Sequence, residues 1–259
     1  MQQVYPVQRP LDPEDVYTDL MFEPPEDRPY VIFNMVSSID GKTTINGELR
    51  KVRIGSSTDR RLMEWIRLPC DMVLRGAETV RVNPRYTGVS EDLAARRQKV
   101  GRPAQPLVGI VSASCNLPLD KPLFTDPPRR PVVITCEQAP QDALAAVSEK
   151  ADVIIAGSER VDPERALALL QERYGVRRLL LEGGPRLNYD FLRAGLVDEI
   201  FWTIAPKLIG RAKDKTMVEG RDVFHPMPSA RLVTAFVHED EFYLRYRILG
   251  SPSAVRRSH

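Results

Sequence analysis

The sequence lacks the short motifs by which many enzymes bind a nucleotide or attack an ester. It has no G-x-G-x-x-G after the first predicted strand, no G-x-x-x-x-G-K-[ST] and no G-x-S-x-G. These motifs place glycines or a nucleophile at a strand-to-helix turn, so their absence excludes a Rossmann fingerprint, a P-loop and a nucleophile elbow. A dinucleotide, if one binds, must be held in another way.

Histidine and cysteine are also scarce. The three histidines lack the spacing of metal ligands, so no metal site is predicted. The three cysteines, Cys70, Cys115 and Cys136, are odd in number and widely separated. They make no disulfide framework and fit a reducing compartment.

Long apolar runs and an excess of one charge are missing as well. No run approaches the length that crosses a bilayer, and the N-terminus is acidic and proline-rich rather than signal-like. A formal net charge of +2 gives no electrostatic case for nucleic acid or a membrane surface. We therefore expect a cytoplasmic protein whose partner is a small molecule.

What is present is an alternation of apolar runs and amphipathic segments. Strands are expected at 30–36, 71–76, 107–111, 131–135, 151–156, 179–181 and 199–205, with helices beginning near 57, 92, 162 and 185. Residues 231–237 and 242–249 are typical of an antiparallel hairpin. The pattern predicts an α/β fold with a mostly parallel sheet flanked by helices. We expect an extended arm at 1–28, one domain at 29–250 and a disordered tail at 251–259.

Polar residues fall where three of these strands end. Asp40 and Thr79 follow two of them, and the third ends in Glu182, Gly183 and Gly184. Ligands bind outside the carboxyl ends of parallel strands, and glycines let a ligand approach the backbone. Pro185 would begin a helix whose N-terminus attracts phosphate. An ordinary strand-to-helix turn is equally compatible with these residues.

Four segments together resemble one family. They are Ser-Ile-Asp-Gly-Lys at 38–42, Gly-Ala-Glu-Thr-Val at 76–80, Glu-Gly-Gly-Pro at 182–185 and the longer stretch 195–210. In this order they resemble the pyrimidine reductase family of riboflavin biosynthesis. The resemblance implies a dihydrofolate-reductase-like three-layer sandwich, usually a homodimer. It also implies a reductase that uses NADPH to convert the ribosyl group of a phosphorylated aminopyrimidine to ribityl.

The resemblance also implies roles for individual residues at the cofactor. The threonine of the second motif contacts NADPH, as do the glycine turn and the start of the following helix, while two serines hold the adenosine end. These residues are Thr79, Gly183, Gly184, Pro185, Arg186, Leu187, Ser112 and Ser114.

On the substrate side, Glu182 is expected to face the ribose, with Lys42 nearby and Asp40 lining the same site. A carboxylate and an ammonium could together open the ribosylamine to an imine. Arg67 matches a family arginine that helps to hold the substrate phosphate. Asn83 and Arg85 are further candidates for substrate binding.

Two departures from the family leave alternatives open. The segment after Val80 is one residue shorter than usual, and Val89 stands where the family has a distal arginine, for which Arg85 could substitute. The chain also lacks the H-x-E and P-C-x-x-C motifs of the deaminase often fused to this reductase, so it resembles a stand-alone enzyme. A paralogue that reduces dihydrofolate or another pterin is one alternative. A nucleotide-binding module without turnover is another.

Overall fold

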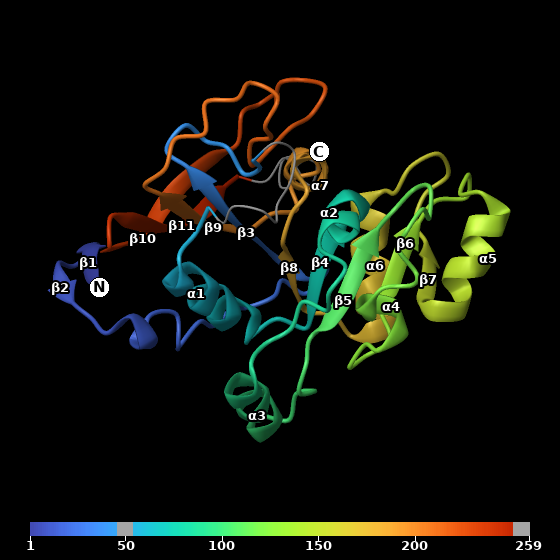
Figure 1. Ribbon diagram of the computed structural model, residues 1–259, viewed down its shortest axis with the longest axis horizontal. Helices are drawn as coiled ribbons and strands as arrows, with labels where there is room; N and C mark the ends of the chain where they lie inside the picture. The colour runs from blue at the N-terminus through green and yellow to red at the C-terminus, as the bar shows by residue number, and fades with distance from the viewer. Residues whose placement is uncertain (46–53, 251–259) are drawn as a thin grey trace.

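A computed structural model describes residues 1–45 and 54–250 of the chain. Within these residues one sheet of eleven strands runs through the molecule in the order β2-β1-β10-β11-β9-β3-β8-β4-β5-β6-β7 (Figure 1). Its parallel part consists of β9 (Glu199–Ala205), β3 (Tyr30–Ser38), β8 (Arg178–Leu181), β4 (Met72–Gly76), β5 (Leu107–Val111), β6 (Val132–Thr135) and β7 (Asp152–Ile155). The predicted mostly parallel α/β fold is confirmed.

The antiparallel part contains the predicted C-terminal hairpin and two further strands. β11 (Glu241–Leu249) pairs with β9 and with β10 (Ser229–His238). β10 in turn pairs with β1 (Gln2–Tyr5), and β1 pairs with β2 (Arg9–Pro10). The hairpin is therefore not the edge of the sheet.

The N-terminal segment corrects the expectation of an extended arm at 1–28. Besides β1 and β2, it contains the short 3-10 helix η1 (Pro13–Asp15), which is capped by the Asp12 side chain. Val16, Tyr17 and Phe22 are buried against the sheet of the same chain. The tail predicted at 251–259 lies outside the described residues.

Helices cover both faces because successive strand residues point to opposite sides. In β3, Val31 and Phe33 pack with α6 (Pro163–Tyr174) and α7 (Pro185–Arg193), whereas Ile32 packs with α1 (Ser57–Arg67). The remaining helices pack on the α1 side and are α2 (Ala77–Val82), α3 (Glu91–Lys99), α4 (Pro122–Thr125) and α5 (Gln141–Lys150). This arrangement is the predicted three-layer sandwich.

The central strand β8 positions the site. Although it comes late in the sequence, it lies between β3 and β4 and pairs with both. Leu179, Leu180 and Leu181 are fully buried, and each contributes about 1.5–3 kcal/mol of hydrophobic stabilisation. Because three parallel strands meet here, their carboxyl ends form one crevice. No helix in the described part of the chain is long and apolar enough to cross a membrane.

Candidate active site

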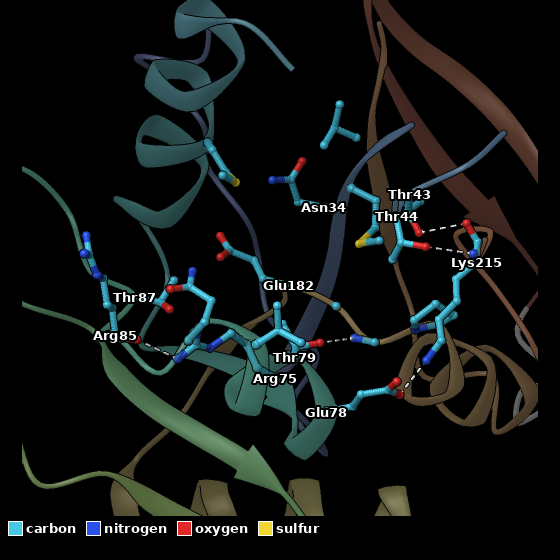
Figure 2. A pocket seen from close by; sticks show the side chains of 18 of the residues that line it. Asn34, Thr43, Thr44, Arg75, Glu78, Thr79, Arg85, Thr87, Glu182 and Lys215 are labelled. Atoms are coloured by element: carbon cyan, nitrogen blue, oxygen red, sulfur yellow. Dashed lines mark hydrogen bonds and ion pairs between the residues drawn. The ribbon is translucent and has the colours of Figure 1, made fainter. Parts of the chain in front are cut away.

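Two adjoining cavities open at the carboxyl ends of β3, β4 and β8. The first has a volume of about 400 Å³ and contains Glu182 and Thr79 in its lining (Figure 2). The second, of about 410 Å³, begins at the N-terminus of α7. Both are lined by Glu78, Gly184 and Lys215. Two ligands can therefore meet at the turn between β8 and α7.

That turn is held by main-chain bonds to β4 and by one side chain. Gly76 N–H donates to the Gly183 carbonyl at 3.0 Å, and Gly184 N–H donates to Thr79 Oγ1 at 3.1 Å. Gly183 has a φ of +89°, which favours glycine, and a Cβ there would lie 3.4 Å from Thr79 Oγ1. The glycine turn and Thr79 thus form one unit, as the motif predicts.

Glu182 is fixed by an arginine from the end of α1. Arg67 Nε and Nη2 donate to the two carboxylate oxygens at 2.6 and 2.8 Å, and Nη1 donates to the Gly88 carbonyl at 3.0 Å. The two side chains are only 13% and 8% exposed. A bidentate ion pair of this kind fixes the orientation of the Glu182 carboxylate and compensates its charge. Arg67 lies in the predicted site, with its guanidinium bound to Glu182.

A second buried arginine supports the loop that carries Asn83 and Arg85. Arg75 in β4 is 2% exposed, and its guanidinium donates to the carbonyls of Asn83 at 3.1 Å and Arg85 at 2.8 Å. Its Nε has no hydrogen-bond partner among the described residues. Burial lowers the pKa of Arg75 to about 10, and the Glu182 carboxylate opposes this shift.

The opposite wall joins two distant segments. Lys215, from the loop between β9 and β10, pairs with Glu78 at 2.5 Å. Its main-chain N–H donates to Thr44 Oγ1 at 2.9 Å, while its carbonyl accepts from Thr43 Oγ1 at 3.2 Å (Figure 2). These contacts close the pocket on the side away from Arg75 and Arg85.

The second cavity has groups that suit the phosphates of a dinucleotide. α7 begins after Gly184, which offers no side-chain cap, so the first-turn N–H groups are not used by a capping side chain. Arg186 and Arg221 also line this cavity, together with Leu187. A helix N-terminus beside arginines fits a phosphate, so the residues present are compatible with NADPH.

Other predicted site residues are not brought to either cavity. Asp40 accepts from the N–H groups of Ile209 and Gly210 at 3.1 and 2.7 Å. The hydrogen bond that the Ser38 hydroxyl donates to Asp40, together with the two bonds from main-chain N–H groups, lowers the pKa of Asp40 to about 2. Lys42 Nζ donates to the Asp214 carbonyl at 3.0 Å. Asp40 and Lys42 therefore stabilise loops beside the site, and their catalytic roles stay predictions.

The two serines expected at the adenosine end lie just beyond the second cavity. Val111, the last residue of β5, lines it, but Ser112 and Ser114 do not. Ser112 is buried, and its hydroxyl has no partner within the described residues. Ser114 Oγ accepts from Asn116 N–H at 3.4 Å. Their contact with the cofactor stays a prediction.

Some site residues escaped the sequence analysis although a signal was present. Asn34 and Arg75 each interrupt an apolar strand, and both line the first cavity. A polar side chain inside a buried strand needs a partner, so this pattern could have marked them. Thr43, Thr44 and Lys215 gave no such signal, because their contacts join segments far apart in the sequence. Across residues 1–45 and 54–250, no group of three or more His, Cys, Asp or Glu side chains is placed to hold a metal.

Comparison with known proteins decides the family. Residues 29–237 match the model of the RibD C-terminal domain. The chain belongs to this family. It is 36% identical over 195 residues to 2,5-diamino-6-ribosylamino-4(3H)-pyrimidinone 5′-phosphate reductase of Archaeoglobus fulgidus, covering 74% of this chain and 87% of that protein. The protein of the same name from Methanothermobacter thermautotrophicus is 34% identical, covering 86% of this chain and 100% of that one.

A solved structure agrees with this assignment. The pyrimidine reductase-like protein of Corynebacterium diphtheriae superimposes with a TM-score of 0.77 at 25% identity, over 86% of this chain and 93% of that one. The family resemblance and the reductase-type fold inferred from the four motifs are confirmed.

Proposed function

We propose that this protein is an NADPH-dependent reductase that converts the ribosyl group of a phosphorylated ribosylaminopyrimidine to a ribityl chain. The observation that carries the proposal is the position of Glu182, which Arg67 holds in the first cavity, two residues before Gly184, which lines both cavities. The names of the two archaeal relatives support the same substrate class.

The first cavity suits the pyrimidine and its ribose. Met35, Met63 and Val82 offer apolar surface for a flat ring, while Asn34 and Thr87 offer polar groups at its edges. Such a mixture of apolar walls and few polar groups is usual for small-molecule sites. With the pyrimidine ring against these apolar side chains, the ribose lies next to Glu182.

The chemistry at the ribose begins with ring opening. The bond between C1′ and O4′ breaks, the amine nitrogen donates its electron pair to C1′, and O4′ takes up a proton from solvent. The product of this step is a protonated imine. The fixed Glu182 carboxylate stabilises the positive charge that develops there, and the buried setting strengthens that interaction.

The second cavity is assigned to the cofactor. When bound, NADPH supplies the hydride that reduces C1′. Thr79 and Gly183 shape the backbone next to it, and the N-terminus of α7 with Arg186 holds phosphate. The choice of NADPH over NADH, a homodimeric assembly and a cytoplasmic location are part of this proposal through the family resemblance.

NADPH oxidation by the purified protein tests the proposal. The ribosylaminopyrimidine phosphate, in its form before and after ring deamination, and dihydrofolate are offered in parallel. We expect oxidation with a pyrimidine only. Oxidation with dihydrofolate alone would favour a pterin reductase. Binding of NADPH without oxidation by any of them would favour a module without turnover.

A further inference from the structure

One ion pair belongs to both cavities. Lys215 and Glu78 line each of them, and no other cation or carboxylate of the described residues does so. Lys215 Nζ lies 2.5 Å from Glu78 Oε2, and Figure 2 shows the lysine side chain reaching from the wall with Thr43 and Thr44 to Glu78. The pair therefore lies at the boundary between the cavity assigned to the substrate and the cavity assigned to the cofactor.

The main chain at Lys215 is fixed, so its ammonium can change partner without a movement of the loop. The Lys215 carbonyl accepts from the Thr43 N–H at 2.7 Å, and the Lys215 N–H donates to the Thr44 hydroxyl at 2.9 Å. Four residues later, the Glu219 N–H donates to the Pro185 carbonyl at 3.2 Å, which ties this loop to the first turn of α7. The ammonium thus stays beside the N-terminus of α7 whichever anion it contacts.

The contact with Glu78 is easily exchanged. The side chain of Lys215 is 31% exposed and that of Glu78 is 63% exposed. An ion pair this exposed contributes little to stability, because water solvates the carboxylate nearly as well as the ammonium does. A diphosphate at the N-terminus of α7 carries two negative charges in a less exposed place, so it attracts the ammonium more strongly than Glu78 does.

We propose that Lys215 exchanges Glu78 for the diphosphate of NADPH when the cofactor binds, and that Glu78 acts against NADPH binding by competing for this ammonium. This inference rests on the proposed function, which places the cofactor in the second cavity. Lys215 is then a cofactor-binding residue that none of the four sequence motifs contains. The exchange also removes a side-chain bridge from the boundary that the hydride has to cross on its way to the ribose.

Fluorescence titration with NADPH distinguishes this exchange from a pair that only supports the structure. Lys215→Met should raise the Kd about tenfold, because an ionic contact with the diphosphate is lost. Glu78→Gln should lower the Kd about threefold, because the ammonium no longer has to leave a carboxylate. A pair with only a structural role would weaken binding when either partner is changed. Lys213→Met is the matched control, since Lys213 is exposed in the same loop and lines neither cavity.

Titration with NADH in parallel locates the contact. NADPH and NADH share the diphosphate and differ in the 2′-phosphate, so Lys215→Met should weaken the binding of both by a similar factor. A loss confined to NADPH would place Lys215 at the 2′-phosphate and overturn the exchange. Weaker NADPH binding by Glu78→Gln, or unchanged binding by Lys215→Met, would overturn it as well.

The reductase assay keeps this inference apart from the proposed function. If the two variants shift the Kd in opposite directions but no pyrimidine is reduced, the proposed function fails and the exchange stands. If the wild type reduces a pyrimidine and both variants bind NADPH as the wild type does, the exchange fails and the proposed function stands. Melting curves identify a variant that does not fold, and if Lys215→Met is one, the direction of the Glu78→Gln shift decides.

Discussion

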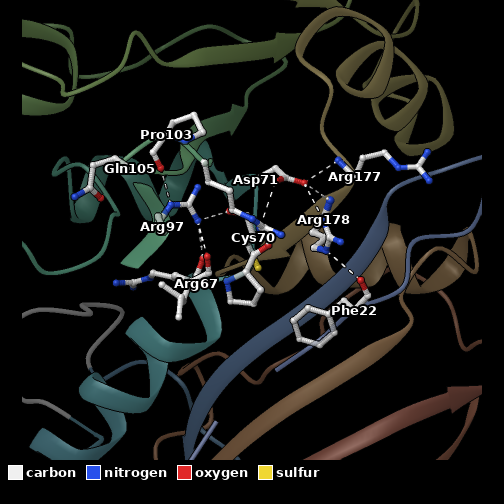
Figure 3. A network of polar contacts seen from close by, with 12 residues as sticks. Phe22, Arg67, Cys70, Asp71, Arg97, Pro103, Gln105, Arg177 and Arg178 are labelled. Carbon is white, nitrogen blue, oxygen red and sulfur yellow. Dashed lines mark hydrogen bonds and ion pairs between the residues drawn. The ribbon is translucent and has the colours of Figure 1, made fainter. Parts of the chain in front are cut away.

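The two ends of the central strands use buried arginines differently. At the carboxyl end, Arg75 binds two carbonyl oxygens, faces a cavity and has an Nε without a partner in the described part of the chain. At the amino end of β4, Arg97 of α3 is equally buried (Figure 3). Its donors reach the carbonyls of Pro103 at 2.9 Å and of Leu68 and Cys70 at 2.7 Å each.

The surroundings of Arg97 continue this main-chain network. Asp71 accepts from the N–H groups of Arg177 and Arg178 at 3.0 and 2.8 Å, and Arg178 donates to the Phe22 carbonyl (Figure 3). Burial lowers the pKa of Arg97 to about 10, as it does for Arg75. The pKa therefore does not distinguish the two arginines. What distinguishes them is the Nε of Arg75, which is buried and has no hydrogen-bond partner among the described residues, whereas the Nε of Arg97 donates to the Pro103 carbonyl.

The largest effect is expected at the carboxyl end from Glu182→Gln. It should lower kcat about 10³-fold, or about 4 kcal/mol, because the charge that stabilises the imine is lost. The dissociation constant of NADPH, measured by fluorescence titration, should change by about threefold or less. Equal losses in turnover and NADPH affinity would remove Glu182 from its role at the substrate.

The counterpart of this change at the amino end is Asp71→Asn. It weakens two bonds from main-chain N–H groups, so it should cost about 1–3 kcal/mol of stability and leave kcat within about threefold. A loss of turnover comparable to that of Glu182→Gln would contradict the division between the two ends.

Arg97→Met should be the more destabilising of two matched arginine changes. It leaves several carbonyl groups without donors, so we expect the free energy of unfolding in urea to fall by about 3 kcal/mol, with kcat/KM within about threefold of the wild type. Arg75→Met should cost less stability, because fewer carbonyls lose a donor, and should lower kcat/KM about tenfold, because it releases a loop that lines the first cavity. The comparison breaks if the two variants exchange these effects.

Asp59 of α1 provides a pH test beside the site. Burial, with the charge of Glu241 adding to it, raises the pKa of Asp59 from 3.8 to about 6. Stability linked to the neutral acid is therefore fully present below about pH 4 and is lost as the pH rises through about 6. The stability of Asp59→Asn relative to the wild type should therefore increase by about 3 kcal/mol as the pH rises from about 4 to about 7. A difference in the free energy of unfolding between Asp59→Asn and the wild type that stays constant across this pH range would contradict the burial argument.

The smallest expected change concerns the glycine turn. Gly183→Ala places a side chain at a φ of +89° beside Thr79 and should cost about 1 kcal/mol and weaken NADPH binding about tenfold. Gly175→Ala, at a φ of +65° with nothing within 4 Å, should cost a similar amount of stability and leave NADPH binding unchanged. Equal NADPH affinity in the two variants would separate the turn from the cofactor.

The elements that the sequence predicted are those with local signals. The β8 strand has three buried leucines, α6 has Asp162 at its start and Gly175 at its end, and the Glu182 turn follows directly. α5 was missed because Pro140 gives it no side-chain cap, and among its residues only Val147 is buried. Such a helix has little periodicity to detect.

Contacts between distant segments could not be predicted. β1 was missed because its partner is β10, near the other end of the chain, and pairing of this kind has no local pattern. The same holds for the pair of Lys215 with Glu78 and for the bonds from Arg75 to the loop. The site residues found from sequence therefore came from motifs, and those missed came from tertiary packing.

Deuterium transfer tests the central claim most directly. The protein is given NADPH labelled at C4 of the nicotinamide, each epimer in turn, with the phosphorylated ribosylaminopyrimidine, and the product is analysed by mass spectrometry and NMR. The account predicts a ribityl product with one deuterium at C1′ from one of the epimers, formed about 10³-fold more slowly by Glu182→Gln. Oxidation of NADPH that leaves C1′ unlabelled, or labelled product at the wild-type rate from Glu182→Gln, would contradict it.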